Sequence, residues 1–396
     1  MKKGLVAVLL AALLASLCIG CGETTTSSGG AGDTSTQTET STKADLNAPD
    51  IEGLTYESTV ELEYAERFKI YRYEGGYSVI RVYDGRDYIL IPEGGEVPSD
   101  LPGNVTVMQK PLDDIYIQAT SSMCFFASLD AMDHLRLSGK QIDGWYVDEA
   151  VEAMENGELI FAGKYSEPDY ELLVSESCDL ALESTMLLHN PEVLEKLEEM
   201  GIPVFIERST YEKNPLAKIE WIKVIGEMVD EPEAAQEIYD VQKGYVQSLD
   251  DFENTEKTVA FFYVNDNGVV VTRKSSDYLP AMIELAGGRY CFENLGDPEK
   301  ATSGVNMTME EFYANTKDVD YLIYNASIAD PLESIDDLIA INSLFADYKA
   351  VKEGNVWTTG KSLHQATDAL GAMILDINTM LTNDSAEELT YMKRLH

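Results

Sequence analysis

The feature that most limits how this chain can fold is a helical stretch in its middle. Residues 215–254 read PLAKIEWIKVIGEMV and then EPEAAQEIYDVQKGYVQSLDDFEN, interrupted near Asp230–Pro232, with no strand-like segment between them. On either side short apolar strands alternate with helices, a pattern typical of parallel sheets covered by helices on both faces. We therefore predict an α/β fold of two Rossmann-like lobes joined by one long α-helix, placed at residues 231–256.

The first lobe is assigned to residues 51–230 and the second to residues 257–396. Residues 54–107 alternate at a period of two, with Gly pairs and an Asp-Gly step at the turns, which predicts a meander of β-hairpins. Beyond it the sequence predicts strands at DDIYIQAT, ELIFAG, CDLALEST and IPVFIE. Helices are expected at FFASLDAMDHLRLSG (residues 125–139), DYELLVSES and NPEVLEKLEEMG. The second lobe begins with the strand VAFFYV and alternates in the same way.

The N-terminus has the pattern of an export signal. Lys2 and Lys3 precede an apolar run that is too short for a good membrane-spanning helix and that ends in CIGC. This end resembles a bacterial lipobox, with Cys21 as the residue that carries the lipid and Cys18 in place of the usual Leu. Residues 1–20 are therefore expected to be a lipoprotein signal peptide, with an ordinary secretory signal as the alternative. The Ser/Thr-rich residues 21–50 are expected to form a flexible tether that holds the protein at the outer face of the cytoplasmic membrane.

The charge of the chain excludes one class of partner. The formal net charge is −41, so no basic stripe remains to meet the phosphates of a nucleic acid. Cys124, Cys178 and Cys291 are the cysteines left after the export segment, and their spacing indicates neither a disulfide framework nor a zinc motif.

Several motifs in sequence order resemble one family. The strand IPVFIE is followed by a tyrosine, a proline-leucine and a Glu-Trp-Ile-Lys helix that leads to a glycine; EAAQEIYDVQKGYV and IELAGG follow further on. In this chain the first set is Tyr211, Pro215, Leu216, Glu220, Trp221, Ile222, Lys223 and Gly226. From about Ile51 to the C-terminus the sequence resembles the substrate-binding lipoproteins of ABC importers for iron–siderophores, haem and cobalamin. The resemblance implies a monomeric receptor with no cofactor of its own, which holds a metal chelate between the lobes and delivers it to a permease and its ATPase.

Candidate ligand-binding residues lie in the loops that follow predicted strands. Ligands of open α/β sheets collect at the carboxyl ends of the strands, and two such edges facing each other enclose a cleft. The candidates are Ser121, Ser122, Met123, Phe125, Ser184, Thr185, Met186, Arg208, Ser209, Tyr211, Arg273, Lys274 and Asn325, with Trp357 and His364 as further possibilities. Packing at the surface or in the core is the alternative for each of them.

The candidates favour one ligand class. Ferric siderophores are often anionic, and Arg208, Arg273 and Lys274 are expected to form a local positive patch for such a ligand. A haem would require an axial ligand, for which Tyr211 or His189 is proposed, and a corrinoid is the other alternative. The four histidines are scattered along the chain, which disfavours a site for a bare metal ion.

Two glutamates are candidates for docking on the permease. In the resembled family one glutamate on each lobe meets arginines of the permease, and the matching positions are Glu171 and Glu310, with Glu311 as a neighbour. Charge pairs of this kind set docking orientation and rate. The alternative is that each glutamate stabilises the first turn of a helix.

Other classes of function lack their motifs. The sequence has no Gly-x-Ser-x-Gly elbow, zinc-ligand spacing or phosphate-binding glycine loop, so we do not expect an enzyme. Cys124 is better explained as a small buried residue than as a nucleophile. The absence of repeats weighs against an adhesin.

Overall fold

The computed structural model describes residues 48–298 and 303–396 of the chain. The expected signal peptide, the lipidated Cys21 and almost all of the tether lie outside these residues. Within the described residues, no helix combines the length and the apolar character needed to cross a membrane.

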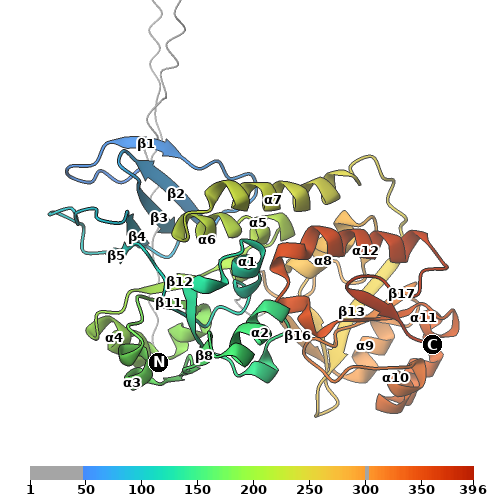
Figure 1. Cartoon of the computed structure of the whole chain (residues 1–396). Coiled ribbons are helices and arrows are strands. Elements are labelled where there is room, and N and C mark those ends of the chain that lie inside the picture. The colour runs from blue at the N-terminus through green and yellow to red at the C-terminus, as the bar shows by residue number, and fades with distance from the viewer. Residues whose placement is uncertain (1–47, 299–302) are drawn as a thin grey trace, which may run out of the picture. The chain divides into compact units, whose positions relative to one another are not determined.

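The first described region is a five-stranded sheet, called here the accessory sheet (Figure 1). Its strands, in spatial as well as chain order, are β1 (Tyr56–Thr59), β2 (Phe68–Tyr73), β3 (Tyr77–Val82), β4 (Arg86–Ile91) and β5 (Val105–Gln109). The first four pair antiparallel, as predicted, but β5 runs parallel to β4, so the expected meander of hairpins is wrong at its end. The connection 92–104 is long enough to return the chain to the start of β4, which a tight turn cannot do.

The first lobe contains an all-parallel sheet in the order β12-β11-β6-β7-β8. Its strands are β6 (Ile115–Ile117), β7 (Leu135–Ser138), β8 (Ile160–Phe161), β11 (Leu180–Ser184) and β12 (Val204–Glu207). Its helices are α1 (Met123–Ser128), α2 (Asp148–Asn156), α3 (Tyr170–Ser175) and α4 (Pro191–Glu199), and β9 (Gly163–Lys164) pairs with β10 (Glu167–Pro168).

The helix predicted over residues 125–139 is wrong in its second half. Helix α1 ends at Ser128, and Asp130 then takes a positive φ of 55° that no helix continues through. Leu135 and Leu137 are buried on either side of the half-buried Arg136, which is the alternation of a strand. The apolar spacing of the segment fitted a helix only because two elements were read as one.

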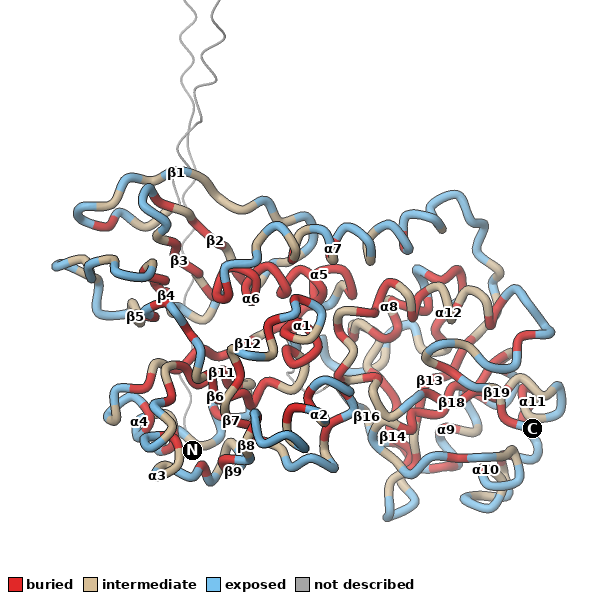
Figure 2. The backbone as a smooth tube through the Cα atoms, in the orientation of Figure 1, coloured by how far each residue is buried: buried red, intermediate tan, exposed pale blue. Residues whose placement is uncertain are grey.

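The long central stretch forms three helices: α5 (Pro215–Ile219), α6 (Ile222–Met228) and α7 (Pro232–Gln247). The predicted interruption is confirmed, because Asp230 has a φ of 61° and Pro232 begins α7. Helix α7 is shorter than the expected 231–256, since the chain is irregular from residue 248 to residue 257. Residues 215–229 are all buried, whereas α7 keeps an exposed face (Figure 2).

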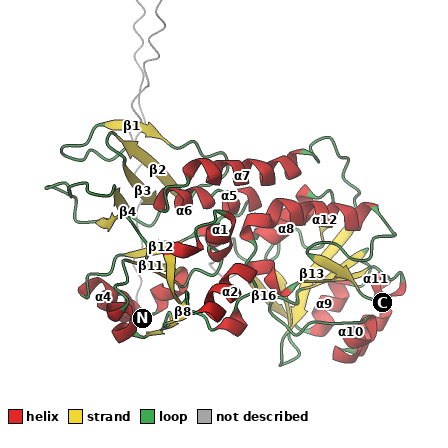
Figure 3. Cartoon of the chain, in the orientation of Figure 1, coloured by secondary structure: helices red, strands yellow, loops and turns green. Residues whose placement is uncertain are grey.

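The second lobe contains a mixed sheet in the order β16-β14-β13-β17-β18-β19, with β15 paired to β13. Figure 3 shows strands β13 and β16 of this sheet among the helices of the second lobe. Its strands are β13 (Thr258–Val264), β14 (Val270–Arg273), β15 (Arg289–Tyr290), β16 (Gly304–Met307), β17 (Tyr321–Tyr324), β18 (Val356–Thr359) and β19 (Met392–Arg394). Strands β13, β15, β17 and β18 are parallel, and the other three run antiparallel to their neighbours. Its helices are α8 (Tyr278–Leu285), α9 (Met309–Thr316), α10 (Ile335–Ile341), α11 (Lys349–Lys352) and α12 (Leu370–Thr382).

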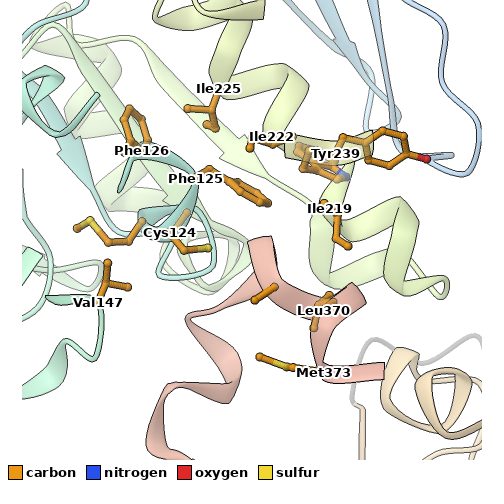
Figure 4. Close-up of a cluster of buried hydrophobic side chains, with 14 of the residues drawn as sticks. Cys124, Phe125, Phe126, Val147, Ile219, Ile222, Ile225, Tyr239, Leu370 and Met373 are labelled. Atoms are coloured by element: carbon orange, nitrogen blue, oxygen red, sulfur yellow. The ribbon is translucent and has the colours of Figure 1, made fainter. Parts of the chain in front are cut away.

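One hydrophobic core crosses the junction between the lobes. It joins Phe125 of α1, Ile222 of α6, and Leu370 and Met373 of α12 (Figure 4). Helices α7 and α12 approach so closely that a Cβ added to Gly371 would lie 2.2 Å from the Gln242 carbonyl oxygen. The predicted fold of two α/β lobes with a connecting helix is therefore confirmed, and the lobes also share packed side chains beneath that helix.

Buried carboxylates fasten the accessory sheet to the lobe junction. The fully buried Glu220 accepts hydrogen bonds from the backbone N–H groups of residues 63, 64 and 65 at 2.7–2.8 Å. It also pairs with Lys223 Nζ at 3.1 Å, and Lys223 in turn donates to the Glu61 carbonyl. Glu212 accepts from the N–H groups of residues 66 and 67. In the segment before β2, the backbone N–H groups of the five residues 63–67 thus donate hydrogen bonds to two acidic side chains.

We predict that Glu220→Ala destabilises the protein by about 3–5 kcal/mol, because the buried Lys223 ammonium and three backbone donors lose their acceptor. Urea unfolding measures the change. Glu237→Ala, on the exposed face of α7, is the matched control and should change stability by less than about 0.5 kcal/mol. Equal stabilities of the two variants would show that Glu220 does not hold the sheet.

Candidate functional site

The carboxyl edge of the first-lobe sheet faces loops of the second lobe. Gln365, in the loop after β18, accepts a hydrogen bond from the Tyr146 N–H and donates to the Gly144 carbonyl, both at 2.9 Å. The hydroxyl of Ser128 on α1 donates to Asp368. Residues 144 and 146 follow β7, so these contacts join loops that lie far apart in the sequence but at facing edges of the two lobes.

A line of polar side chains, called here the interlobe polar chain, crosses beside these contacts. Glu207, at the end of β12, accepts from Ser121 Oγ at 3.2 Å and from the Ser209 N–H. Lys218 of α5 donates to the Ser209 carbonyl at 2.9 Å, and its Nζ lies 4.8 Å from the centre of the Tyr278 ring.

On the second-lobe side the chain continues through a histidine. Tyr278 Oη lies 3.2 Å from His364 Nδ1, and Arg273 Nη2 lies 3.0 Å from His364 Nε2. Arginine donates only, so Nε2 is the acceptor, and in the neutral ring the proton sits on Nδ1 and is donated to Tyr278.

Burial sets the protonation of the groups in this chain. Desolvation, helped by the charge of Arg273, lowers the pKa of His364 to about 3, which keeps the imidazole neutral. Burial also lowers the pKa of Lys218, while the nearby Glu207 and Asp277 carboxylates oppose that change. Burial raises the pKa of Asp277, and the positive charges of Arg273 and Lys218 limit this increase. The chain is therefore a set of buried charges that compensate one another.

An open cavity of about 710 Å³ adjoins the polar chain. One wall is the start of α5 after β12, with Lys213, Asn214 and Pro215. The opposite wall consists of the loop after β14, helix α8 and the segment around β15, which contribute residues such as Asp277, Glu284 and Phe292. We call this cavity the interlobe pocket. Its size and its mixture of apolar and polar walls fit a small-molecule ligand rather than a macromolecule.

Four of the predicted residues belong to the polar chain beside the pocket: Ser121, Ser209, Arg273 and His364. Lys274, which is half-buried, is the chain neighbour of Ser275 in the pocket wall. Ser121, Ser209 and His364 come from loops after the parallel strands β6, β12 and β18, where the rule places sites, whereas Arg273 and Lys274 lie at the end of β14, which runs antiparallel to β13.

Other candidates lie inside the protein. Met123 and Phe125 are buried in the shared core, and Ser122 is the buried N-cap residue of α1. Trp357 and Asn325 are also buried; the Asn325 side-chain oxygen accepts from the Ser327 N–H at 3.2 Å. Met123 and Phe125 pack in the core, whereas the buried Asn325 Nδ2 and Trp357 Nε1 have no hydrogen-bond partner among the described residues, so a binding role for these residues stays a prediction.

The loop after β11 stands apart from the pocket lining. Ser184 caps the 3-10 turn Thr185–His189 by accepting from the Met186 N–H, and Thr185 is half-buried. Met186 is 45% exposed and His189 is exposed as well.

Arg208, one of the residues of the expected positive patch, is paired with the accessory sheet. Arg208 forms an ion pair with Asp84 of the β3–β4 turn at 2.7 Å, and its guanidinium lies over the Tyr211 ring. The accessory sheet thus supplies the counter-charge for Arg208, and neither Arg208 nor Tyr211 lines the interlobe pocket. Arg208 is turned toward a sheet whose position the sequence did not reveal, and its grouping with Arg273 and Lys274 around a ligand stays a prediction.

The two docking candidates occupy equivalent places. Glu171 lies in the first turn of α3, which precedes β11, and Glu310 and Glu311 lie in the first turn of α9, which precedes β17. All three are exposed. A helix that leads into a parallel strand begins at the carboxyl edge of the sheet, and Glu310 and Glu311 lie there beside residues 268 and 269 of the β13–β14 turn.

Sequence reasoning missed Glu207, Lys218, Asp277 and Tyr278. The available indication was Lys218 within the apolar helix PLAKI, since a charged residue in a fully apolar turn requires a buried partner. Glu207 and the Ser209 carbonyl come from the same lobe a few residues earlier, whereas Asp277 and Tyr278 come from the other lobe and were not predictable from the local sequence.

Comparison with known proteins identifies the fold. The periplasmic binding protein family matches residues 136–363, more than half of the chain, and the chain belongs to this family. The accessory sheet lies outside the matched residues. The family and the similar solved structures are binding proteins, not enzymes.

Two uncharacterized lipoproteins of Methanocaldococcus jannaschii are relatives at 22% identity, one over 81% of this chain and 81% of its own length, the other over 79% and 81%. Among solved structures, the periplasmic haem binding protein HutB of Vibrio cholerae has a TM-score of 0.55 at 16% identity, over 68% of this chain and 98% of that protein. The petrobactin-binding protein YclQ of Bacillus subtilis also has a TM-score of 0.55, at 14% identity, over 68% and 92%. These likenesses concern the fold.

The buried neutral His364 predicts a pH dependence of stability. Its folded pKa of about 3 lies below the unfolded value of about 6.5, so the unfolded state binds the extra proton, and stability is lost as pH falls from about 6.5 toward 3. Between pH 7 and pH 5 the titration of His364 should lower the free energy of unfolding by about 2 kcal/mol. The His364→Gln variant should lose less stability than the unmodified protein over this pH range, as measured by urea unfolding at both pH values. The control is His189→Gln at an exposed position, and an unchanged pH slope in His364→Gln would contradict the prediction.

Proposed function

We propose that this protein is the extracytoplasmic substrate-binding receptor of an ABC importer, and that it captures a ferric-siderophore-type complex in the interlobe pocket. The observation that carries the proposal is the cavity of about 710 Å³ between facing loops of the two lobes in a periplasmic binding protein fold. Similar structures include proteins named for binding petrobactin, haem and vitamin B12, which supports a chelate-sized ligand.

The pocket lining favours a siderophore over haem. Haem in such a site requires an axial Tyr or His. Of the residues that line the pocket, Tyr290 is the one with such a group, and its hydroxyl already donates to the Arg273 carbonyl at 2.7 Å. Burial raises the pKa of Tyr290 further above its usual value, which disfavours the phenolate. A ferric siderophore brings its own metal ligands and needs none from the protein.

We also propose the cellular setting from the sequence. Cys21 would carry the lipid that anchors the receptor to the outer face of the cytoplasmic membrane, and the named lipoprotein relatives agree with this assignment. The receptor would act as a monomer, with the permease and its ATPase as partners, and with no cofactor besides the transported ligand.

Direct binding tests the ligand class. The full-length protein in detergent is titrated with a ferric trihydroxamate, a ferric tris-catecholate, haemin and cyanocobalamin, and tryptophan fluorescence is recorded. We expect saturable binding of at least one ferric chelate. Phe292→Ala, in the pocket wall, should weaken that binding about tenfold by removing apolar contact, whereas Tyr245→Ala on the exposed face of α7 should not. Binding of haemin or cyanocobalamin alone, or of none of the four, would overturn the proposal.

Charge reversal tests permease docking. The double variant Glu171→Lys and Glu310→Lys should abolish uptake of the iron chelate by cells while the affinity of the purified receptor stays the same, because both residues are exposed and outside the pocket lining. Glu192→Lys with Glu195→Lys, two exposed charge reversals on α4, controls for the change in net charge. Normal uptake by the double variant would remove these two residues from the docking surface.

A further inference from the structure

The charged side chains that line the interlobe pocket include more acids than bases. The acids are Asp277, Glu284 and Glu293, and the bases are Lys213 and Arg289. A binding site for an anionic ligand normally places uncompensated Arg or Lys donors at the ligand. The lining of this pocket instead contains more acidic than basic side chains.

The arginine of the lining is already paired. Arg289 donates from Nη1 to Glu256 and from Nη2 to Glu293, each at 3.2 Å. Glu284 is an exposed acid of the lining, and its Oε1 accepts from the Tyr290 N–H at 2.9 Å. The remaining base, Lys213, is exposed at the edge of the pocket, where water screens its charge.

The cations behind the pocket wall do not change this balance. Arg273 is buried, and its guanidinium donates to Ser303 Oγ at 2.8 Å and to His364 Nε2. The buried Lys218 donates a hydrogen bond to the Ser209 carbonyl, and the negative charges of Glu207 and Asp277 balance its positive charge. An anion that recruited either cation would have to break the interlobe polar chain and leave a buried carboxylate without its counter-charge.

We infer that the interlobe pocket is selective for a metal chelate without net negative charge, such as a neutral or cationic ferric hydroxamate. This inference rests on the proposed function. An anionic chelate entering the pocket would lose water, would meet Lys213 as the one cation of the described lining outside an ion pair, and would face the acids Glu284 and Glu293, while the net charge of −41 would oppose its approach. A ferric tris-hydroxamate is neutral because each hydroxamate carries one negative charge, whereas a ferric tris-catecholate is a trianion.

The apolar part of the lining agrees with this ligand class. Pro215, Pro280, Leu285 and Phe292 present hydrocarbon surface on both sides of the pocket. Linear hydroxamate chelators join their metal-binding groups by methylene chains, which such surface accommodates. An ammonium group on the ligand would be met by Glu284 or Glu293.

Paired affinities test the inference. Full-length protein is titrated with ferrioxamine B, a cationic ferric trihydroxamate, and with ferric enterobactin, a trianionic tris-catecholate. We expect at least about tenfold tighter binding of the cationic complex at low ionic strength, and a smaller difference at high salt, where charge interactions are screened. Equal or tighter binding of the trianion would overturn the inference while leaving the proposed function intact. Binding of haemin or cyanocobalamin without either ferric complex would overturn the proposed function itself.

A matched pair of variants locates the selectivity. Glu284→Gln with Glu293→Gln neutralises the two exposed acids of the lining, and the amide introduced at position 284 keeps an oxygen for the Tyr290 N–H. The ratio of the two affinities should fall about tenfold. Asp251→Asn with Glu253→Gln removes the same charge from an exposed loop outside the lining and should leave the ratio unchanged. If both double variants change the ratio equally, the selectivity comes from the net charge of the protein and the pocket inference is wrong.

Discussion

The complete burial of residues 215–229 is the constraint on which the rest of this structure depends. These two short helices contain Lys218, Glu220, Lys223 and Glu227, and a buried charge is tolerated only with a partner. Glu220 and Glu227 take theirs from the accessory sheet, by backbone N–H groups and by Arg72 at 2.8 Å. Lys218 takes its partners at the edge of the pocket. The same buried segment therefore joins the accessory sheet, the lobe junction and the edge of the interlobe pocket.

The shared core limits how far the two walls of the interlobe pocket can move relative to each other. The pocket walls belong to different lobes, but those lobes share the core around Phe125, Ile222 and Leu370. Relative movement of the walls must disturb packed side chains or the interlobe polar chain, both of which resist small displacements. A pre-formed pocket of fixed charge results. On the proposed function, the selectivity of this pocket would depend on the residues already in its walls more than on rearrangement around the ligand.

The sequence predicted the element order well where periodicity and local capping agreed. Strands at CDLALEST and VAFFYV and the helix NPEVLEKLEEMG occur as expected, and Pro232 begins α7 after the predicted break. Prediction failed where the deciding contact was distant. Residues 125–139 were read as one helix because Leu135 and Leu137 fit either period until the neighbouring strands β6 and β8 are known. The parallel pairing of β5 likewise depends on where the connection 92–104 returns the chain.

The candidate site, like the fold, was predictable from the sequence only where local features decide the outcome. By itself the sequence determined the fold class, the placement of functional loops after the strands and the presence of charged residues in an apolar helix, because these follow from periodicity and composition within short windows. Only the tertiary structure decided which of those charges are available to a ligand. Arg208 was a strong candidate until Asp84, more than a hundred residues earlier, neutralised it, and Lys218 and His364 became one polar chain only when the lobes met. Charge compensation is a property of spatial neighbours, and sequence spacing does not contain it.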